Sequence, residues 1–372
     1  MLEAVNRRPN LALALIAGYF LLCIALRLSA STSLEIDESE QAYVSQFLML
    51  GYGSQPPFYN WLQYGLTSLF GPSVATMTVL KNGLLFLCCL FFGLASREVL
   101  GDRRLAAIAT MGVLALPPIF LLAQRDLSHT VAALFAVSLF LYAFLRTMNR
   151  PTLFAYALTG VAVGIGVISK YNFVIVPVAA IVAILPEPKL RARLFDWRIL
   201  VAIAICVLIA LPHGYWVLQN IGAASSNTFK EMGTGQEAGF VSKAFKAIVA
   251  LVASTLRGSG IILVVFALVF RKDLPAIWRA DSLWARVVGR MLVLCLGAVL
   301  VIMLVAGATH MREKWLVLFL ALLPLYLALK VEASGVDTMR SVRPVDFHNV
   351  PKVAKPRTVH QQTDVHRPTG AQ

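Results

Sequence analysis

Charged residues are scarce in this sequence, and their scarcity excludes an ordinary water-soluble domain. Only 14% of the 372 residues are Asp, Glu, Lys or Arg, whereas 58% are hydrophobic. A typical soluble domain carries about 25% charged residues. The apolar residues also come in runs long enough to cross a hydrocarbon core of about 30 Å. The composition therefore predicts an all-α polytopic membrane protein.

About ten apolar segments are expected to cross the membrane as a bundle of helices. Two of them come from the stretch 153–186, which is too long for one crossing and carries Lys170 and Tyr171 in its middle. We therefore divide this stretch into two short helices, 153–169 and 172–186. The other eight crossings are predicted at 11–30, 73–95, 105–124, 129–147, 199–219, 247–270, 289–309 and 315–331.

Cysteine and histidine are also few, which leaves little basis for a disulfide framework or a metal centre. The five cysteines lie inside apolar runs, where they behave as small hydrophobic side chains. The six histidines and the loop carboxylates lack the spacing of a strong metal site. A divalent cation is compatible with this sequence but is not indicated by it. The repeated halves of many transporters are not visible either.

Acidic residues are outnumbered by basic ones, 19 to 33, and the basic residues are unevenly distributed along the chain. With a cytoplasmic N-terminus, sixteen Lys and Arg residues before the C-terminal tail fall on the cytoplasmic side, and ten fall on or near the other side. Because positive charge is retained in the cytoplasm, this bias predicts that both termini are cytoplasmic. The net charge of +14 is thus a signal of topology rather than of nucleic-acid binding. The first apolar run, about 20 residues long, favours a retained anchor over a cleaved signal peptide.

The first external loop, about 31–72, concentrates acids beside the membrane. Asp37, Glu38 and Glu40 fall within four residues. For a single acid, a solvated helix start is the more common explanation. Asp37 is a suitable N-cap, and a helix beginning there would hold its carboxylate at the positive end of the helix dipole. Adjacent residues on a helix face different directions, so Asp37 and Glu38 are expected to have different roles.

The same loop is expected to form two surface helices. Tyr43, Phe47 and Leu50 follow one another at spacings of four and three, and Gly51 is a natural C-terminal stop for the first helix. After the turn "GYGSQPP", the aromatic-rich segment "FYNWLQY" suits a second helix at the level of the lipid headgroups.

Two more loops bring ionisable residues to the same side of the membrane. "QRDLSH" contains Arg125 and Asp126, and "THMREKW" contains His310, Arg312 and Lys314. Transfer from a phosphate-linked donor needs a carboxylate base for the incoming hydroxyl group and positive charge for the phosphate that leaves. The combination of these loops with the first one therefore indicates a transfer site on one face of the bundle.

Simpler roles stay open for several of these residues. Lys170 in the short loop "SKYN" would equally extend its ammonium to the membrane interface. His310 would serve as an exposed loop residue. His129 and His213 are expected to form hydrogen bonds at helix ends or within the bundle rather than to bind a metal.

At these residues the sequence resembles a known family. "IDESEQAY", "GYGSQPPFYNWL", "QRDLSH", "SKYNF" and "MREKWLVLFLALLPLYL" occur in the order typical of the bacterial GT-C glycosyltransferases that use polyprenyl-phosphate sugars. The class includes protein mannosyltransferases, the aminoarabinose transferase of lipid A and rhizobial galacturonosyltransferases. The resemblance covers residues 10–331. The first-loop acids together with the Pro-Pro motif carry it most strongly, whereas "SKYNF" alone is weak.

The resemblance implies roles for particular residues. Asp37 corresponds to the first-loop acid that serves as catalytic base, and Glu38 becomes its neighbour in positioning a substrate. Asp126 takes the position of the second-loop acid, which would orient the acceptor or a divalent ion. The resemblance further assigns binding of the lipid phosphate to Lys170, His310, Arg312 and Lys314, and substrate positioning to Gln55, Tyr59, Arg125 and Tyr171.

The chain is expected to comprise a transmembrane glycosyltransferase domain, 1–331, and a disordered basic cytoplasmic tail, 332–372. Members of the class usually continue past the "LLPLYL" helix into further helices or an external domain. The polar tail of this chain departs from that pattern, and both a genuine tail and a truncated reading frame fit it.

The function implied is that of a bacterial inner-membrane enzyme. It would move a sugar from a polyprenyl-phosphate donor to lipopolysaccharide, lipid A or another envelope acceptor, with a periplasmic active site and without a nucleotide or any certain cofactor. The sugar and the acceptor are not specified. Two alternatives stay open: a transporter or flippase of lipid-linked sugars, and a non-catalytic homologue. A transporter would be expected to carry charges along a path through the membrane, whereas here the charges gather at one surface.

Overall fold

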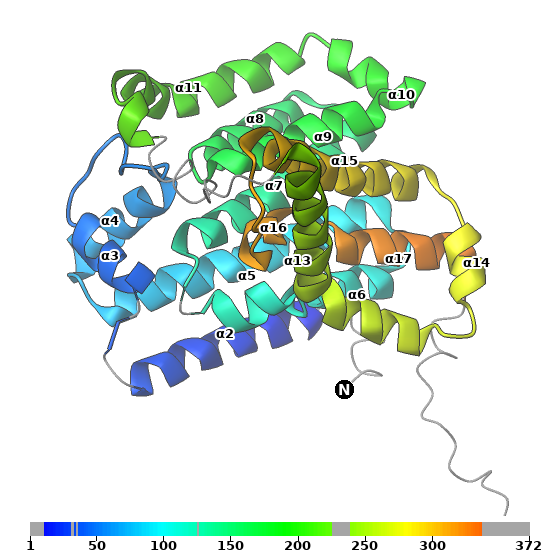
Figure 1. Ribbon diagram of the computed structural model, residues 1–372, viewed down its shortest axis with the longest axis horizontal. Coiled ribbons are helices and arrows are strands. Elements are labelled where there is room, and N and C mark those ends of the chain that lie inside the picture. Colours follow the sequence, from blue (N-terminus) through cyan, green and yellow to red (C-terminus); the bar gives the residue numbers. More distant parts are fainter. Residues whose placement is uncertain (1–10, 31–32, 35, 125, 225–238, 337–372) are drawn as a thin grey trace, which may run out of the picture. The chain divides into compact units, whose positions relative to one another are not determined.

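The computed structural model describes residues 11–30, 33–34, 36–124, 126–224 and 239–336, and these residues are folded almost entirely into helices (Figure 1). Within the described residues the extended pairing is limited to one isolated bridge between Tyr52 and Gln55, in a turn. The all-α class expected from the sequence is therefore confirmed. The predicted tail lies largely in 337–372, outside the described residues.

Seven helical segments are long and apolar enough to cross a membrane. The last of these segments consists of two consecutive helices, α16 and α17, and each of the others is a single helix. Their bounds are α2 Leu11–Ser29, α5 Val74–Val99, α7 Ser128–Asn149, α11 Ile199–Gln219, α13 Phe240–Val269, α15 Leu283–Ala306, α16 Glu313–Leu320 and α17 Leu323–Ser334.

Two shorter apolar segments fill the stretch that the sequence divided at Lys170. They are α8, Leu153–Val167, and the continuous pair η2, Tyr171–Val174, and α9, Ile175–Ile184. The division into two short helices is thus confirmed. The remaining short elements are α3 Ile36–Val44, α4 Phe58–Phe70, α6 Arg103–Leu114, η1 Pro118–Leu122, α10 Pro188–Arg191, η3 Ala192–Phe195 and α14 Leu274–Arg279.

The crossing expected at 105–124 is not a continuous α-helix. Helix α6 ends at Leu114, and the chain resumes as the single-turn π-helix η1 from Pro118. Pro117 and Pro118 lack the backbone N–H groups that would continue the helix, so the break follows from the sequence. The expected number of ten crossings is therefore not confirmed in the described part of the chain.

Helix α7 forms the centre of the bundle. It packs along α5 on one side and against α8 on another. Of its most apolar stretch of 18 residues, 89% is buried. Small residues of α7 and hydrogen bonds in the protein interior allow α7 to pack closely against these neighbours. The Ser138 hydroxyl, for example, lies 3.1 Å from the Cys88 sulfur of α5. A helix that is apolar on all sides is expected in this central position.

Helix α8 lies between α7 and α11, and glycine allows its close approach to α11 (Figure 1). A Cβ atom at Gly160 would collide with the backbone of Ala202, and one at Gly164 would lie 2.9 Å from the Ile209 side chain. Gly160 and Gly164 are four residues apart and share one face of α8. This is the small-residue spacing that brings transmembrane helices into backbone contact.

Helix α11 exposes most of its apolar surface. Of its most apolar stretch of 18 residues, only 11% is buried. Exposed apolar side chains on a membrane-spanning helix face the lipid, so α11 is an outer helix of the bundle. The exposed residues include Leu200, Ile203, Val207, Leu208, Leu211 and Leu218.

The first loop forms two helices as expected, but the ends of the first helix differ from the predicted ones. Asp37 lies in the first turn of α3 rather than at its N-cap, and α3 ends at Val44 rather than at Gly51. Helix α4 begins directly after Pro57, so the second helix is confirmed. Its aromatic face is not entirely at the lipid surface, because Tyr59 is fully buried.

The contact between α8 and α11 makes a testable difference between two glycines. Gly160→Ala should lower the melting temperature of the purified protein, because overpacking of this kind costs about 1–3 kcal/mol. Gly214→Ala in α11 is the matched control, since a Cβ atom there meets nothing within 4 Å. Alanine is also the better helix former, so the control should be neutral or slightly stabilising. Equal melting temperatures for the two variants would show that the glycine contact is unimportant.

Candidate active site

A cavity of about 430 Å³ lies where the first loop meets the starts of α7, η2 and α16. Five of the site residues expected from the sequence line it, although they come from four separate segments of the chain. The lining residues are Asp37, Glu40, Ser54, Gln55, Pro56, Leu127, Ser128, His129, Thr130, Lys170, Tyr171, Asn172, Lys314 and Trp315.

Asp37 is tied to the start of α7. Its Oδ2 atom accepts a hydrogen bond of 2.9 Å from the backbone N–H of Leu127, the residue that precedes the helix. Leu127 has a φ of 70°, and among the described residues no other non-glycine residue has a positive φ. Such a conformation costs about 1–3 kcal/mol and is typically found at functional sites. The Asp37 carboxylate also lies at the positive end of the α7 dipole.

Glu40 is a second acid at the cavity, one turn along α3 from Asp37. Desolvation and the negative charge of Asp37 raise the pKa of Glu40 above its ordinary value of 4.5. Two carboxylates in one cavity repel each other when both are ionised. Glu40 therefore gains a proton more readily than an isolated glutamate would.

Two lysines bring positive charge to the cavity from different elements. Lys170 precedes η2 and donates a hydrogen bond of 2.6 Å from Nζ to the Thr130 hydroxyl. Lys314 lies in the first turn of α16. The cavity thus combines carboxylates from α3 with ammonium groups from η2 and α16.

Gln55 and Tyr171 both line the cavity, and each is held by contacts outside it. Gln55 is fixed by backbone hydrogen bonds with Tyr52 of 3.2 and 3.4 Å, across the turn that contains Gly53. The Tyr171 hydroxyl lies 3.2 Å from Nε2 of His213 in α11. Gln55 and Tyr171 are therefore held in place before a substrate arrives.

His213 also fixes the first loop. Its Nδ1 lies 2.8 Å from the carbonyl oxygen of Leu50, and its ring stacks between those of Tyr171 and Trp216, each 5.9 Å away. Gly51, which follows Leu50 in the chain, has no room for a Cβ atom because the Trp216 ring occupies that space. The expected role of His213 as a hydrogen-bonding residue of the bundle agrees with this geometry.

Glu38 does not line the cavity. It is 3% exposed, and its carboxylate lies 2.9 Å from Arg27 at the end of α2 and 3.9 Å from Lys81 of α5. Lys81 is itself only 1% exposed. A buried carboxylate between two cations has a role in holding helices together, so the expectation that Glu38 contacts a substrate is not supported by its position.

Other expected site residues also lie outside the cavity lining. Asp126 is adjacent to the strained Leu127 but does not line the cavity, and Tyr59 is buried with its ring 5.8 Å from that of His129. His310 and Arg312 are exposed and are not among the lining residues. Arg125 lies outside the described residues.

Several lining residues were not anticipated as site residues. His129 and Thr130 enter through the first turn of α7, and Asn172 and Trp315 flank the two lysines. Asn172 donates to the carbonyl oxygen of Trp315 at 3.5 Å, which joins η2 to α16. The one sequence signal for these residues was their position next to expected site residues in the short loops.

A metal-binding cluster is not evident in the described part of the chain. The His, Cys, Asp and Glu residues there do not gather in groups of three or more that could hold an ion. Asp37 and Glu40 form a pair rather than a complete set of ligands.

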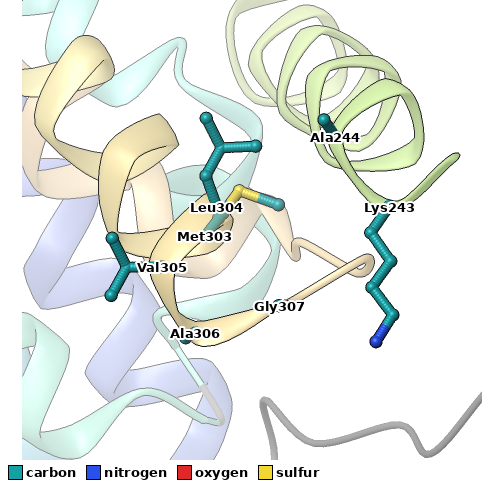
Figure 2. A pocket seen from close by; sticks show the side chains of 7 residues that line it. All are labelled: Lys243, Ala244, Met303, Leu304, Val305, Ala306 and Gly307. Atoms are coloured by element: carbon teal, nitrogen blue, oxygen red, sulfur yellow. The ribbon is translucent and has the colours of Figure 1, made fainter. Parts of the chain in front are cut away.

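A second depression, of about 320 Å³, lies between the start of α13 and the end of α15 (Figure 2). Its walls are formed by Met303 to Gly307 and by Lys243 with Ala244. Lys243 is its one charged lining residue. It does not bring a carboxylate and a cation together, so the first cavity is the better candidate for chemistry.

Comparisons with known proteins identify the family to which the chain belongs. The chain is 44% identical over 348 residues to the lipopolysaccharide core galacturonosyltransferase RgtA of Rhizobium johnstonii, a match that covers 93% of this chain and 70% of RgtA. It is 40% identical over 343 residues to RgtB of the same organism, covering 92% of this chain and 69% of RgtB. The chain belongs to the lipopolysaccharide core galacturonosyltransferase family.

This galacturonosyltransferase family has the fold expected from the resemblance. Residues 54–216 match the family model for dolichyl-phosphate-mannose-protein mannosyltransferase. The structure is similar to that of ArnT from Cupriavidus metallidurans bound to undecaprenyl phosphate, with a TM-score of 0.63 and 15% identity. The match covers 86% of this chain and 59% of ArnT. The fold is thus the GT-C fold of multi-pass bacterial membrane glycosyltransferases, rather than that of a transporter.

The buried ion pairs of this galacturonosyltransferase-family chain predict that Glu38 matters for stability. Glu38→Gln should lower the free energy of unfolding by about 3 kcal/mol, because it removes the buried negative charge that Glu38 supplies to Arg27 and Lys81. Thermal unfolding of the purified protein measures this loss. Glu40→Gln is the matched control on the same helix and should not lower the melting temperature. Equal stability of Glu38→Gln and the parent would contradict the structural role.

The raised pKa of Glu40 predicts a pH-dependent difference in stability. Because the folded pKa lies above the unfolded one, the folded state binds the proton more tightly, and ionisation of Glu40 opposes folding. Glu40→Gln should therefore raise the melting temperature near neutral pH. The gain should shrink in acidic buffer, where Glu40 of the parent is protonated. A difference that stays constant across this pH range would argue against the interaction with Asp37.

Proposed function

We propose that the chain transfers a galacturonosyl residue from a polyprenyl-phosphate donor to the core of lipopolysaccharide. One observation carries the proposal: Asp37, Lys170 and Lys314 line a single cavity in a member of the galacturonosyltransferase family. The choice of galacturonic acid and of the lipopolysaccharide core follows the names of RgtA and RgtB. The choice of a polyprenyl phosphate as the lipid carrier follows the undecaprenyl phosphate bound to ArnT.

Asp37 is proposed as the general base. It belongs to the short helix α3 outside the long apolar helices, where a hydroxyl group of a large glycolipid acceptor can reach it. Its hydrogen bond with Leu127 occupies Oδ2 and holds the carboxylate at a fixed angle. Oδ1 is then available to accept a proton from the acceptor.

The reaction proposed is a single displacement. The acceptor oxygen loses its proton to Asp37 and forms a bond with the anomeric carbon of the donor sugar. The bond between that carbon and the phosphate oxygen breaks, and the lipid phosphate leaves with the electron pair. The configuration at the anomeric carbon is inverted. Lys170 and Lys314 stabilise the negative charge that develops on the departing phosphate.

The assignment of phosphate binding differs in part from the sequence-based one. Lys170 and Lys314 keep the proposed role because both line the cavity. Arg312 and His310 are exposed and lie outside the lining, so they are no longer proposed as primary contacts. Asp126 is proposed as a support for the strained Leu127 rather than as a second base.

The cavity is proposed to open at the periplasmic surface of the inner membrane. The excess of cations at the other end of the helices supports this orientation. Cysteine-accessibility labelling in intact cells tests it. Positions 37 and 314 should react with an impermeant reagent, whereas position 191 in α10 should react after permeabilisation alone.

Radiolabelled transfer tests the function directly. Membranes that contain the chain should move galacturonic acid from its polyprenyl-phosphate donor to a lipopolysaccharide core that lacks this sugar. Nucleotide-linked galacturonic acid should not replace the lipid-linked donor. Binding of the donor without any transfer would indicate a non-catalytic homologue. Movement of the intact donor across the membrane, without transfer, would indicate a flippase.

Asp37→Asn tests the base. Asn preserves the size of the side chain and an oxygen that can accept from Leu127, so folding and donor binding should remain near those of the parent. Turnover should fall by about 10²–10⁴-fold because the amide cannot take the proton. The matched variant Asp126→Asn should retain most of the activity. If Asp126→Asn were inactive and Asp37→Asn active, the base would have to be reassigned to Asp126.

A further inference from the structure

A groove of about 730 Å³ lies at the end of the bundle opposite the candidate active site. It is bounded by the last turn of α9, by α14, by the first half of α15 and by α17. These segments are distant from the cavity because α9 runs away from Tyr171 and α15 runs towards Lys314. The galacturonosyl transfer proposed above makes no use of this groove.

The polar part of the groove is a network of arginines and carboxylates. Glu187 Oε1 lies 3.3 Å from Nε of Arg286 and 3.0 Å from Nη1 of Arg290. Arg286 also contacts Asp281 at 2.5 Å. The hydrogen bond from Arg286, together with that from Arg290, holds the pKa of Glu187 below its ordinary value. Both arginines are thus oriented towards the groove by ionised partners.

The groove still carries a positive charge. Its lining cations are Arg286, Arg290 and Lys330, and its lining carboxylate is Asp281. With Glu187, which contacts both arginines without lining the groove, three cations and two carboxylates leave one net positive charge. The two arginine side chains are 40% and 35% exposed. A guanidinium has five N–H donors, so each arginine keeps donors for a further acceptor beyond its carboxylate.

The rest of the groove is apolar and faces the lipid. Val293 of α15 is 69% exposed, and Val182 of α9 is 40% exposed. Trp278 on the short helix α14 is 76% exposed beside the arginines. Exposed tryptophan is typical of the membrane interface, at the level of the headgroups. The groove therefore has charged donors at its interfacial part and an alkyl surface beside them.

We propose that this groove binds an anionic phospholipid, with the phosphodiester at Arg286 and Arg290 and an acyl chain along Val182 and Val293. One net positive charge complements the single negative charge of a headgroup such as phosphatidylglycerol. Basic pockets between transmembrane helices are a known setting for recognition of anionic lipids. The lipid joins α9, α14 and α15 at the face opposite the transfer site.

Native mass spectrometry of the full chain in detergent tests the proposal, with phosphatidylglycerol as the probe. The parent should retain one phosphatidylglycerol more tightly than phosphatidylcholine with the same acyl chains. Arg290→Gln should weaken retention of phosphatidylglycerol about tenfold, which corresponds to the loss of one charge-assisted hydrogen bond. Glu187 keeps Arg286 as a partner in this variant.

Arg271→Gln is the matched control, because Arg271 is an exposed arginine at the same end of the bundle but outside the groove. It should bind phosphatidylglycerol like the parent. Trp278→Ala removes a groove residue without breaking an ion pair, and it should give a smaller loss. It also provides a second test should Arg290→Gln be unstable.

Several results would overturn the proposal. Equal retention of phosphatidylcholine and phosphatidylglycerol would remove headgroup recognition. Parent-like binding by both Arg290→Gln and Trp278→Ala would place the lipid elsewhere. Displacement of the lipid by an equal concentration of inorganic phosphate would show a small-anion site instead. These measurements do not depend on sugar transfer, so they stand apart from the test of the proposed activity.

Discussion

The hydrogen bond from the Leu127 N–H to Asp37 is the constraint on which the candidate site depends. It joins the first loop to the start of the central helix, and it holds the one non-glycine residue with positive φ among the described residues. The same contact sets the direction of the Asp37 carboxylate and brings the first turn of α7, with His129 and Thr130, to the cavity. A loop that would otherwise be free to move is thereby fixed to the most buried helix of the bundle.

The adjacent acid, Glu38, fixes the same helix to the bundle. It is buried with Arg27 and Lys81, so α3 is attached to both α2 and α5. Removing a partner from such a group leaves a buried charge, which is strongly destabilising. The two neighbouring acids of α3 therefore have different positions: Asp37 lines the cavity, and Glu38 lies in the protein interior.

The class of fold was predictable from the sequence because hydrophobic runs are local features. The division at Lys170 was predictable because the stretch 153–186 is too long for one crossing and carries a charged residue in its middle. The break before η1 was not predicted as a break, because the apolar run continues through Pro117 and Pro118. The lining of the candidate cavity was predictable in part. Asp37, Lys170 and Lys314, selected by loop position, charge and the family resemblance, line the same cavity. The burial of Glu38, in contrast, depends on Lys81, which lies 43 residues away inside an apolar helix. Tertiary pairing of this kind leaves no local pattern in the sequence.

The contact between Gly51 and Trp216 has a consequence for protein engineering. The first loop and the end of α11 are separated by more than 150 residues, yet the Trp216 ring occupies the space of a Gly51 side chain and His213 binds the Leu50 carbonyl. A chimaera that receives this loop from a relative must therefore receive the matching end of α11 as well. Exchange of the loop alone would create a steric clash at position 51 whenever the donor loop carries a larger residue there, even though Asp37 itself had been transferred intact.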